Sequence, residues 1–550
     1  MIAHNPPTGN DPPKDDSCPT RGGRTSFRGA KDDNGRRRGD VHPAVKYIGG
    51  AMVLLAGLIA LAVWKPTVRG EKTLIVYCAA ALEPAVKTIA EQYQTELGVA
   101  VEIRASSSGW LAAQIAASEQ GDLYLPADDS FLNTAHDNGF VAERIPLAQM
   151  HLVLGVKSGN PRNIQTLDDL LRKDITYGFA NVNAAVGKVT QDVLTNQSKW
   201  DEIEAHSKVT HITVTESAMA VQAGNLDAAF VWDTVARQFQ LEAVRLPELS
   251  SGVGRVSVGV LKTTKQPAAA LRFARFLAAA DRGQKTFEKA GYTLVPGDVW
   301  EVEPTITFFS GGIQRLAMKE TIREFEEREG CRINVVYEGC GVLLGMMRGE
   351  NARRPDAYFA CDRSFLSPDD IQPYFLPGRE LTETRMVMLV HKGNPRKIKQ
   401  LTDLAQPDLK VGVAHETNSA LGALTKNLLI SRYLYGAVRE NVRSDGAAKA
   451  DLLVTQILAG GDEALDVVIV YEANTSQVHE TLDVIPIDGP EAIAIQPLAI
   501  GKESSHQQLL ERLCETLTSK ASQTRFEKVG FRWRAAALSK PETTGGREKP

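Results

Sequence analysis

The sequence predicts an α/β protein made of two tandem copies of one domain behind a single transmembrane helix. Three observations lead to this prediction: an internal repeat over most of the chain, apolar strands that alternate with amphipathic helices in each copy, and one uncharged apolar stretch near the amino end. With 43% hydrophobic and 24% charged residues among 550, the composition is that of a globular protein.

The overall charge and the absence of catalytic motifs exclude several classes of protein. A formal net charge of −4 argues against a protein that coats nucleic acid phosphates. The six cysteines show no CxxC spacing and form neither a zinc ribbon nor a disulfide-dense scaffold. The patterns GxxxxGK[ST], HExxH and GxSxG are absent, and no nucleophile stands beside a base. We therefore expect no enzyme activity and no resident cofactor.

The amino end is expected to be a tail followed by an anchor. Residues 1–46 are rich in Pro, Gly, Asp and Arg without apolar periodicity, which is typical of disorder. Residues 47–64 carry no charge and are just long enough to cross a bilayer. No good cleavage site precedes the folded region, so a retained anchor is favoured over a cleaved signal peptide. Arg36, Arg37, Arg38 and Lys46 then place the tail in the cytoplasm, and the rest in the periplasm or extracellular space.

Most of the remaining chain is a repeat. The segment TLIVYCAAALEPAVKTIAEQY from Thr73 matches TITFFSGGIQRLAMKETIREF from Thr305 without gaps. Four further blocks pair in the same order: GDLYLPADDSF with PDAYFACDRSF, SGNPRNIQTLDDL with KGNPRKIKQLTDL, NLDAAFVWD with ALDVVIVYE, and FEKAGY with FEKVGF. This order indicates a duplicated domain, with copy 1 at residues 72–299, copy 2 at 305–535 and a polar tail at 536–550.

Within copy 1, short apolar runs alternate with amphipathic ones. Strands are predicted at 74–77, 100–104 and 123–125, and helices at 83–97 and 110–117. The alternation predicts a sheet with helices on both faces, which binds ligands at the carboxyl ends of its strands.

Small and polar residues follow those strands. Ser107, Ser108 and Gly109 open a helix, where hydroxyls and free N–H groups lie beside the positive end of the helix dipole. Such a loop suits an anion, although serine at a helix start is also an ordinary N-cap. Asp128 and Asp362 end the third strand of each copy, where we expect helix capping rather than catalysis or metal binding.

Each copy resembles the periplasmic substrate-binding proteins of molybdate-type ABC transporters. The resemblance rests on an ordered set of motifs that in copy 1 are Ala80-Ala81-Leu82, Ser108-Gly109-Trp110-Leu111, Asp122 to Asp128 and Asp227 to Trp232. It covers about 460 of the 550 residues. The resemblance implies the type II periplasmic binding fold, in which two α/β lobes are hinged around a cleft.

The resemblance also implies ligand-binding residues in each cleft. Those of copy 1 are Ala81, Ser107, Ser108, Gly109, Asn181 and Trp232. Those of copy 2 are Ser310, Gly311, Gly312, Cys340, Gly341, Asn418, Ser419 and Tyr471.

This sequence departs from the family pattern in both copies. The family normally supplies a first-loop serine, where copy 1 has Ala81 and copy 2 has Gly312, with Ser310 as a substitute nearby. The second-loop serine is Ser108 in copy 1 and Cys340 in copy 2. For Cys340 and Cys361 three readings stay open: two small buried residues, a disulfide, or contact with a ligand such as a soft metal.

The leading hypothesis is an extracytoplasmic protein that captures a small oxyanion, molybdate- or tungstate-like, for an ABC transporter permease. The alternative is a membrane-anchored sensory or scaffolding protein, which the missing first-loop serine favours. In a third reading, one copy binds ligand and the other is structural.

Overall fold

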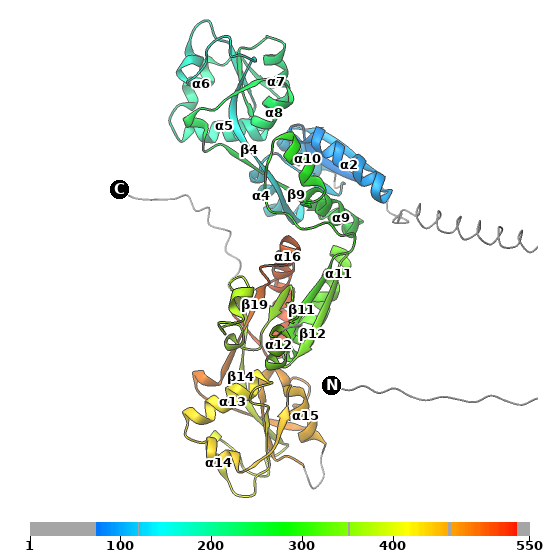
Figure 1. The fold of residues 1–550 in the computed structure, drawn as a ribbon, viewed down its shortest axis with the longest axis vertical. Coiled ribbons are helices and arrows are strands. Elements are labelled where there is room, and N and C mark those ends of the chain that lie inside the picture. Colours follow the sequence, from blue (N-terminus) through cyan, green and yellow to red (C-terminus); the bar gives the residue numbers. More distant parts are fainter. Residues whose placement is uncertain (1–72, 119, 350–351, 460–463, 536–550) are drawn as a thin grey trace, which may run out of the picture. The chain divides into compact units, whose positions relative to one another are not determined.

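The computed structural model describes residues 73–118, 120–349, 352–459 and 464–535. The expected tail at 1–46, the expected anchor at 47–64 and the polar tail at 536–550 lie outside these ranges. Among the helices in the described ranges, none is both long and apolar enough to cross a bilayer. Copies 1 and 2 each fold as an α/β unit, as Figure 1 shows.

Copy 1 has one mixed sheet in the order β2-β1-β3-β9-β4-β7-β5-β6, with β8 and β10 paired to β4. Its strands are β1 (Leu74–Ala79), β2 (Val101–Ser106), β3 (Leu123–Leu125), β4 (Val141–Val156), β5 (Tyr177–Ala180), β6 (Val209–His211), β7 (Ala228–Trp232), β8 (Glu242–Val244), β9 (Val253–Leu261) and β10 (Thr293–Leu294). Its helices are α2 (Glu83–Leu97), α3 (Ser108–Ser118), α4 (Asp129–Asp137), α5 (Ala185–Thr195), α6 (Trp200–His206), α7 (Val214–Gln222), α8 (Asp233–Gln238), α9 (Pro267–Ala278) and α10 (Gly283–Ala290).

Copy 2 repeats this topology as β12-β11-β13-β19-β14-β17-β15-β16, with β18 and β20 paired to β14. Its strands are β11 (Thr305–Gly311), β12 (Arg332–Glu338), β13 (Ala357–Phe359), β14 (Arg379–His391), β15 (Val411–Ala414), β16 (Val442–Ala447), β17 (Val467–Tyr471), β18 (Leu482–Pro486), β19 (Ile493–Ile500) and β20 (Arg532–Trp533). Its helices are α11 (Arg315–Glu329), α12 (Cys340–Met347), α13 (Ala420–Ser431), α14 (Tyr435–Arg439), α15 (Ala450–Leu458), α16 (Gln507–Leu517) and α17 (Lys520–Lys528). The predicted fold class and tandem repeat are confirmed.

One long strand joins the two lobes of each copy. In β4, residues 141–151 pair with β9 in the first lobe, and residues 152–156 pair with β7 in the second. In β14, residues 379–385 pair with β19 and residues 386–390 with β17. Because a single backbone runs through both lobes, the point where its partner changes is a natural hinge.

The elements of the first lobe follow the local sequence closely. The amphipathic pattern and Pro84 in the first turn predict α2 at Glu83–Leu97, which the structure confirms. The helix ends at Gly98 with φ 76°, and its counterpart α11 ends at Gly330 with φ 64°. A left-handed residue at this position favours glycine, so the two matching glycines mark the same helix end.

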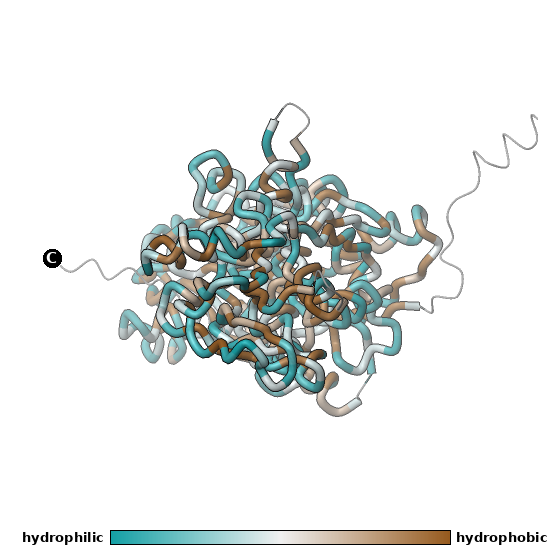
Figure 2. Tube along the Cα trace, turned by 90° about the horizontal axis from the view of Figure 1, so that it is seen from below, coloured by the Kyte–Doolittle hydropathy of each residue, from teal (hydrophilic) through white to brown (hydrophobic). Residues whose placement is uncertain are grey.

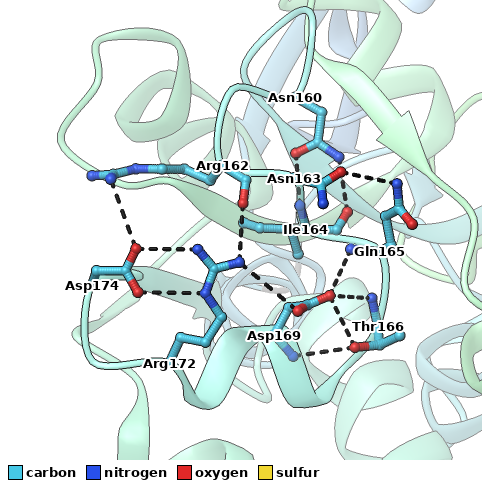
Figure 3. A network of polar contacts seen from close by, with 9 residues as sticks. All are labelled: Asn160, Arg162, Asn163, Ile164, Gln165, Thr166, Asp169, Arg172 and Asp174. Atoms are coloured by element: carbon cyan, nitrogen blue, oxygen red, sulfur yellow. Dashed lines mark hydrogen bonds and ion pairs between the residues drawn. The ribbon is translucent and has the colours of Figure 1, made fainter.

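The repeated SGNPR and KGNPR blocks fold alike. Asn160 Oδ1 accepts the Ile164 N–H at 3.0 Å and its Nδ2 donates to the Ile164 carbonyl (Figure 3). In copy 2, Asn394 makes the same two bonds to Ile398. The duplication therefore extends to individual side-chain hydrogen bonds.

Apolar side chains of both copies fill the space between sheet and helices. Strands such as β7 and β17 are buried along their whole length, as expected where helices cover both faces of a sheet. Figure 2 shows hydrophobic and hydrophilic stretches alternating along the chain. This is the pattern of elements that turn one face inward.

A buried ion cluster connects the copies. Glu329, at the end of α11, contacts Arg275 of α9 at 3.2 Å and Arg512 of α16 at 2.6 Å. All three side chains are at most 6% exposed. Burial opposes ionisation of Glu329, but the two guanidinium groups outweigh it and hold its pKa below the usual range.

Candidate functional site

Each copy has a small pocket where strand ends of the first lobe face helix starts of the second. In copy 1 the empty space between its lining atoms is about 240 Å³, which includes space open to solvent. It is lined by Ala79, Ala80, Ala81, Ser106, Ser107, Ser108, Ala127, Ala184, Ala185, Val186, Thr213, Val214 and Trp232. A ligand of only a few atoms fits such a space.

Three side chains of the copy 1 pocket offer hydrogen-bond donors. The Ser107 hydroxyl and the Trp232 indole N–H are buried and have no hydrogen-bond partner. The Ser108 hydroxyl oxygen accepts the Ala127 N–H at 3.1 Å, which leaves its own proton free to donate. Unsatisfied buried donors cost free energy, so a ligand that accepts from them is favoured.

Helix starts add backbone donors to the same pocket. Ala185 and Val186 begin α5, and Val214 begins α7. The first N–H groups of a helix have no partner within the helix and lie at its positive end. No side chain that lines this pocket carries a charge. The pocket can therefore hold an anion with neutral donors alone.

A backbone hydrogen bond links the two lobes beside each pocket. Gly109 N–H donates to the Asn183 carbonyl at 2.7 Å in copy 1, and Gly341 N–H donates to the Asn418 carbonyl at 3.1 Å in copy 2. Both bonds join the start of a first-lobe helix to the loop after the middle strand of the second lobe. Gly109, Gly341 and Asn418 thus contribute to lobe contact rather than to the pocket lining.

The copy 2 pocket, of about 300 Å³, differs in chemistry. It is lined by Gly312, Ile313, Glu338, Gly339, Cys340, Cys361, Ser419, Leu421, Ala448, Lys449, Ala450, Asp451, Tyr471 and Asn474. Unlike the copy 1 pocket, its lining includes charged side chains, and Lys449 Nζ forms an ion pair with Glu338 Oε1 at 3.0 Å. The Tyr471 hydroxyl is buried without a hydrogen-bond partner, and burial raises its pKa well above the ordinary value.

Cys340 and Cys361 lie together in this pocket as free thiols, as are the other described cysteines. Cys340 Sγ accepts the Cys361 backbone N–H at 3.1 Å. Burial acts to raise the pKa of Cys340, but its interactions with Cys361, including the backbone N–H, outweigh burial and lower that pKa. The neighbouring Cys340 sulfur, together with burial, raises the pKa of Cys361 well above its ordinary value.

The structure brings many, but not all, of the predicted ligand residues to the pockets. Those that line a pocket are Ala81, Ser107, Ser108, Trp232, Gly312, Cys340, Ser419 and Tyr471. Ser310 does not, because its hydroxyl is buried and donates to the Gly311 carbonyl at 3.2 Å. Gly311 lies directly behind the pocket against Cys361.

Asn181 also lies outside the lining, because its Oδ1 accepts the Asn183 N–H at 2.9 Å within its own loop. His415 takes the equivalent place in copy 2 and accepts from the Thr417 and Asn418 N–H groups at 3.2 Å. Both side chains shape the loop that meets the first lobe.

The prediction that Gly312 is the copy 2 counterpart of Ala81 is wrong. Because α2 begins at Glu83 and α11 at Arg315, the counterpart of Ala81 is Ile313 rather than Gly312. The pocket residues that sequence reasoning missed are mainly backbone donors, Ala185, Val186 and Val214. The residue type does not reveal these backbone donors, because the side chains are apolar. Only the predicted start of a helix after a strand indicates them.

The capping expectation for the two aspartates is confirmed. Asp128 Oδ1 accepts the Ser130 N–H and Asp362 Oδ1 accepts the Ser364 N–H, each at 2.9 Å. The second oxygen of each binds a backbone N–H of the returning strand region, at Arg255 and Ile495. These carboxylates therefore hold the strand end in place.

Comparisons with known proteins give the family. The family model for bacterial extracellular solute-binding proteins matches residues 74–293 and again residues 306–532. The molybdate-binding protein ModA of Mycobacterium tuberculosis is 26% identical over 250 residues, which are 44% of this chain and 94% of that protein.

Solved structures are similar over one copy. The periplasmic molybdate-binding protein of Azotobacter vinelandii is 21% identical with a TM-score of 0.37, covering 40% of this chain and 99% of its own. Peb3 of Campylobacter jejuni is 18% identical with a TM-score of 0.34, covering 41% and 99%. The two matches of the family model span both copies. The chain therefore belongs to the bacterial extracellular solute-binding protein family and contains two tandem copies of the family's domain.

Proposed function

We propose that this protein captures a small oxyanion of the molybdate or tungstate type in copy 1 and delivers it to an ABC transporter permease. The observation that carries the proposal is a small pocket in which the Ser107 hydroxyl and the Trp232 indole N–H are buried without a hydrogen-bond partner, and whose lining has no charged side chain. Each donor can bond an oxyanion oxygen, and the absence of carboxylates avoids repulsion. The relative named for molybdate binding supports the choice of ligand class.

The location is part of the same proposal. The apolar residues 47–64 anchor the chain in the cytoplasmic membrane, and both copies lie outside the cytoplasm. Closure of the two lobes about β4 then traps the ligand until a permease opens the cleft. Protease treatment of intact spheroplasts should digest both copies, whereas protection of copies 1 and 2 would contradict this placement.

Binding can be tested on the full chain in detergent. Calorimetric titration with molybdate, tungstate, sulfate and phosphate should give one site in copy 1. Trp232→Phe and Ser107→Ala should each weaken it about tenfold, because each removes one donor worth roughly 1–1.5 kcal/mol. The matched control is Tyr471→Phe, which makes the same kind of change in copy 2 and should leave that affinity unchanged. No binding of any of the four anions would overturn the proposal, as would equal losses from Trp232→Phe and Tyr471→Phe.

A further inference from the structure

The two pockets differ by two neighbouring residue replacements. Cys340 occupies the place of Ser108, since each accepts, at 3.1 Å, the backbone N–H of the second residue after the third strand of its copy. That residue is Ala127 in copy 1 and Cys361 in copy 2. Copy 2 therefore has a second sulfur where copy 1 has a methyl group, and the side chains of Cys340 and Cys361 line the same pocket.

A third replacement makes room for that sulfur. A Cβ on Gly311 would lie 2.1 Å from Cys361 Sγ, closer than any two such atoms can approach. The gapless register from Thr73 and Thr305 places Ala79 at this position in copy 1. The Cys361 thiol therefore fits only because position 311 is a glycine, so the two replacements depend on each other.

The surroundings of the thiols favour a cation over an anion. The residues that line the copy 2 pocket include two carboxylates, Glu338 and Asp451, against one ammonium group, Lys449. The buried Tyr471 hydroxyl lines the same pocket without a partner and offers an oxygen. An oxyanion with two negative charges would be repelled by the net negative charge of these side chains. The copy 1 pocket has no charged side chain in its lining and so no such repulsion.

We propose that copy 2 binds a soft monovalent cation of the Cu(I) class between the sulfurs of Cys340 and Cys361. Thiolates are the ligands that select such ions, and two sulfurs suffice for linear coordination. Within the described residues no group of three or more His, Cys, Asp and Glu side chains is placed to hold a metal, so a four-ligand zinc site is not offered there. On binding, each thiol loses its proton to solvent, two metal–sulfur bonds form, and nothing is oxidised or reduced.

This inference goes beyond the proposed oxyanion function and does not depend on it. The test is anaerobic titration of the reduced full chain with Ag(I), and with Cu(I) against a competing chelator. Wild type should hold one ion at least 100-fold more tightly than the double variant Cys340→Ser with Cys361→Ala, and should release two protons per ion. That variant recreates the Ser108 and Ala127 pair of copy 1 and should therefore fold.

The matched control replaces two buried cysteines outside the pocket, Cys331→Ala with Cys514→Ala, and should keep the tight site. Equal affinity in wild type and in the Cys340 and Cys361 variant overturns the proposal, as does loss of the site in the control. X-ray absorption on metal-loaded wild type gives an independent readout should the variant unfold. Two sulfur neighbours are expected, and a shell of nitrogen or oxygen overturns the site. Molybdate binding that survives in the Cys340 and Cys361 variant separates this result from the function of copy 1.

Discussion

Copy 1 and copy 2 share one scaffold but differ in pocket chemistry. Strand order, the hinge strand, the glycine helix ends and the aspartate caps recur in both. The pockets diverge, because copy 1 presents hydroxyl and indole donors without charge, whereas copy 2 presents two thiols, a phenol and charged groups at the edge. The comparison teaches that a duplicated scaffold can keep its strand order and connecting strand while the chemistry of its pocket changes.

The largest effect is expected where the two copies meet. Glu329→Gln removes the carboxylate that forms ion pairs with the buried guanidinium groups of Arg275 and Arg512, which should cost about 3–5 kcal/mol of unfolding free energy. Urea denaturation of the full chain should then show two separate transitions, one for each copy. Glu324→Gln removes an exposed partner of Arg525 and serves as the control, with a loss below about 1 kcal/mol. A loss that small for Glu329→Gln would show that the copies are joined by other contacts.

The second prediction distinguishes the copies by pH. Burial raises the pKa of Asp129 to about 6, although the Ser257 hydroxyl opposes the shift, and copy 2 has Arg363 at this position. The folded state therefore keeps the proton that the unfolded state has already lost, and copy 1 loses stability as pH rises from about 4 through 6, by about 3 kcal/mol in all.

Asp129→Asn should remove this slope and raise the melting temperature at pH 7.5 but not at pH 4. Asp137→Asn, on the exposed end of the same helix, is the control and should change neither. The assignment fails if the pH dependence of melting is the same in Asp129→Asn as in wild type.

The smallest effect is expected at the backbone hydrogen bond between the two lobes of each copy. A Cβ on Gly341 would lie 1.8 Å from the Thr417 carbonyl oxygen, whereas one on Gly109 would lie 3.0 Å from the Asn183 oxygen. Gly341→Ala should therefore force the copy 2 lobes apart at a cost of about 1–3 kcal/mol, and Gly109→Ala should cost a few tenths. Hydrogen–deuterium exchange should rise in α12 of the first variant and stay unchanged in α3 of the second. Equal exchange in both helices would refute the asymmetry.

The sequence predicted what depends on local pattern. The ranges of α2 and β3 are correct to the residue, and the repeat blocks carry matching hydrogen bonds. The shared hinge in β4 and the insertion of β9 between β3 and β4 were not predicted, because pairing between distant strands leaves no local signal.

The pocket shows the same division between local and distant information. Ser107, Ser108 and Tyr471 were found from motifs that resemble a known family. Trp232 was named from the same motifs, but only the structure shows that its indole N–H is buried without a hydrogen-bond partner. The match between Gly311 and Cys361 depends on a distance across two strands, which only the fold reveals.

The path of the chain through each copy also sets the order in which the protein can be assembled. The first lobe begins with β1 but lacks its central strand β9 until more than a hundred further residues, including the whole second lobe, have been synthesised. β19 imposes the same delay in copy 2. Each first lobe therefore has an unpaired edge at its third strand until that later strand is made, and such an edge can pair with other strands.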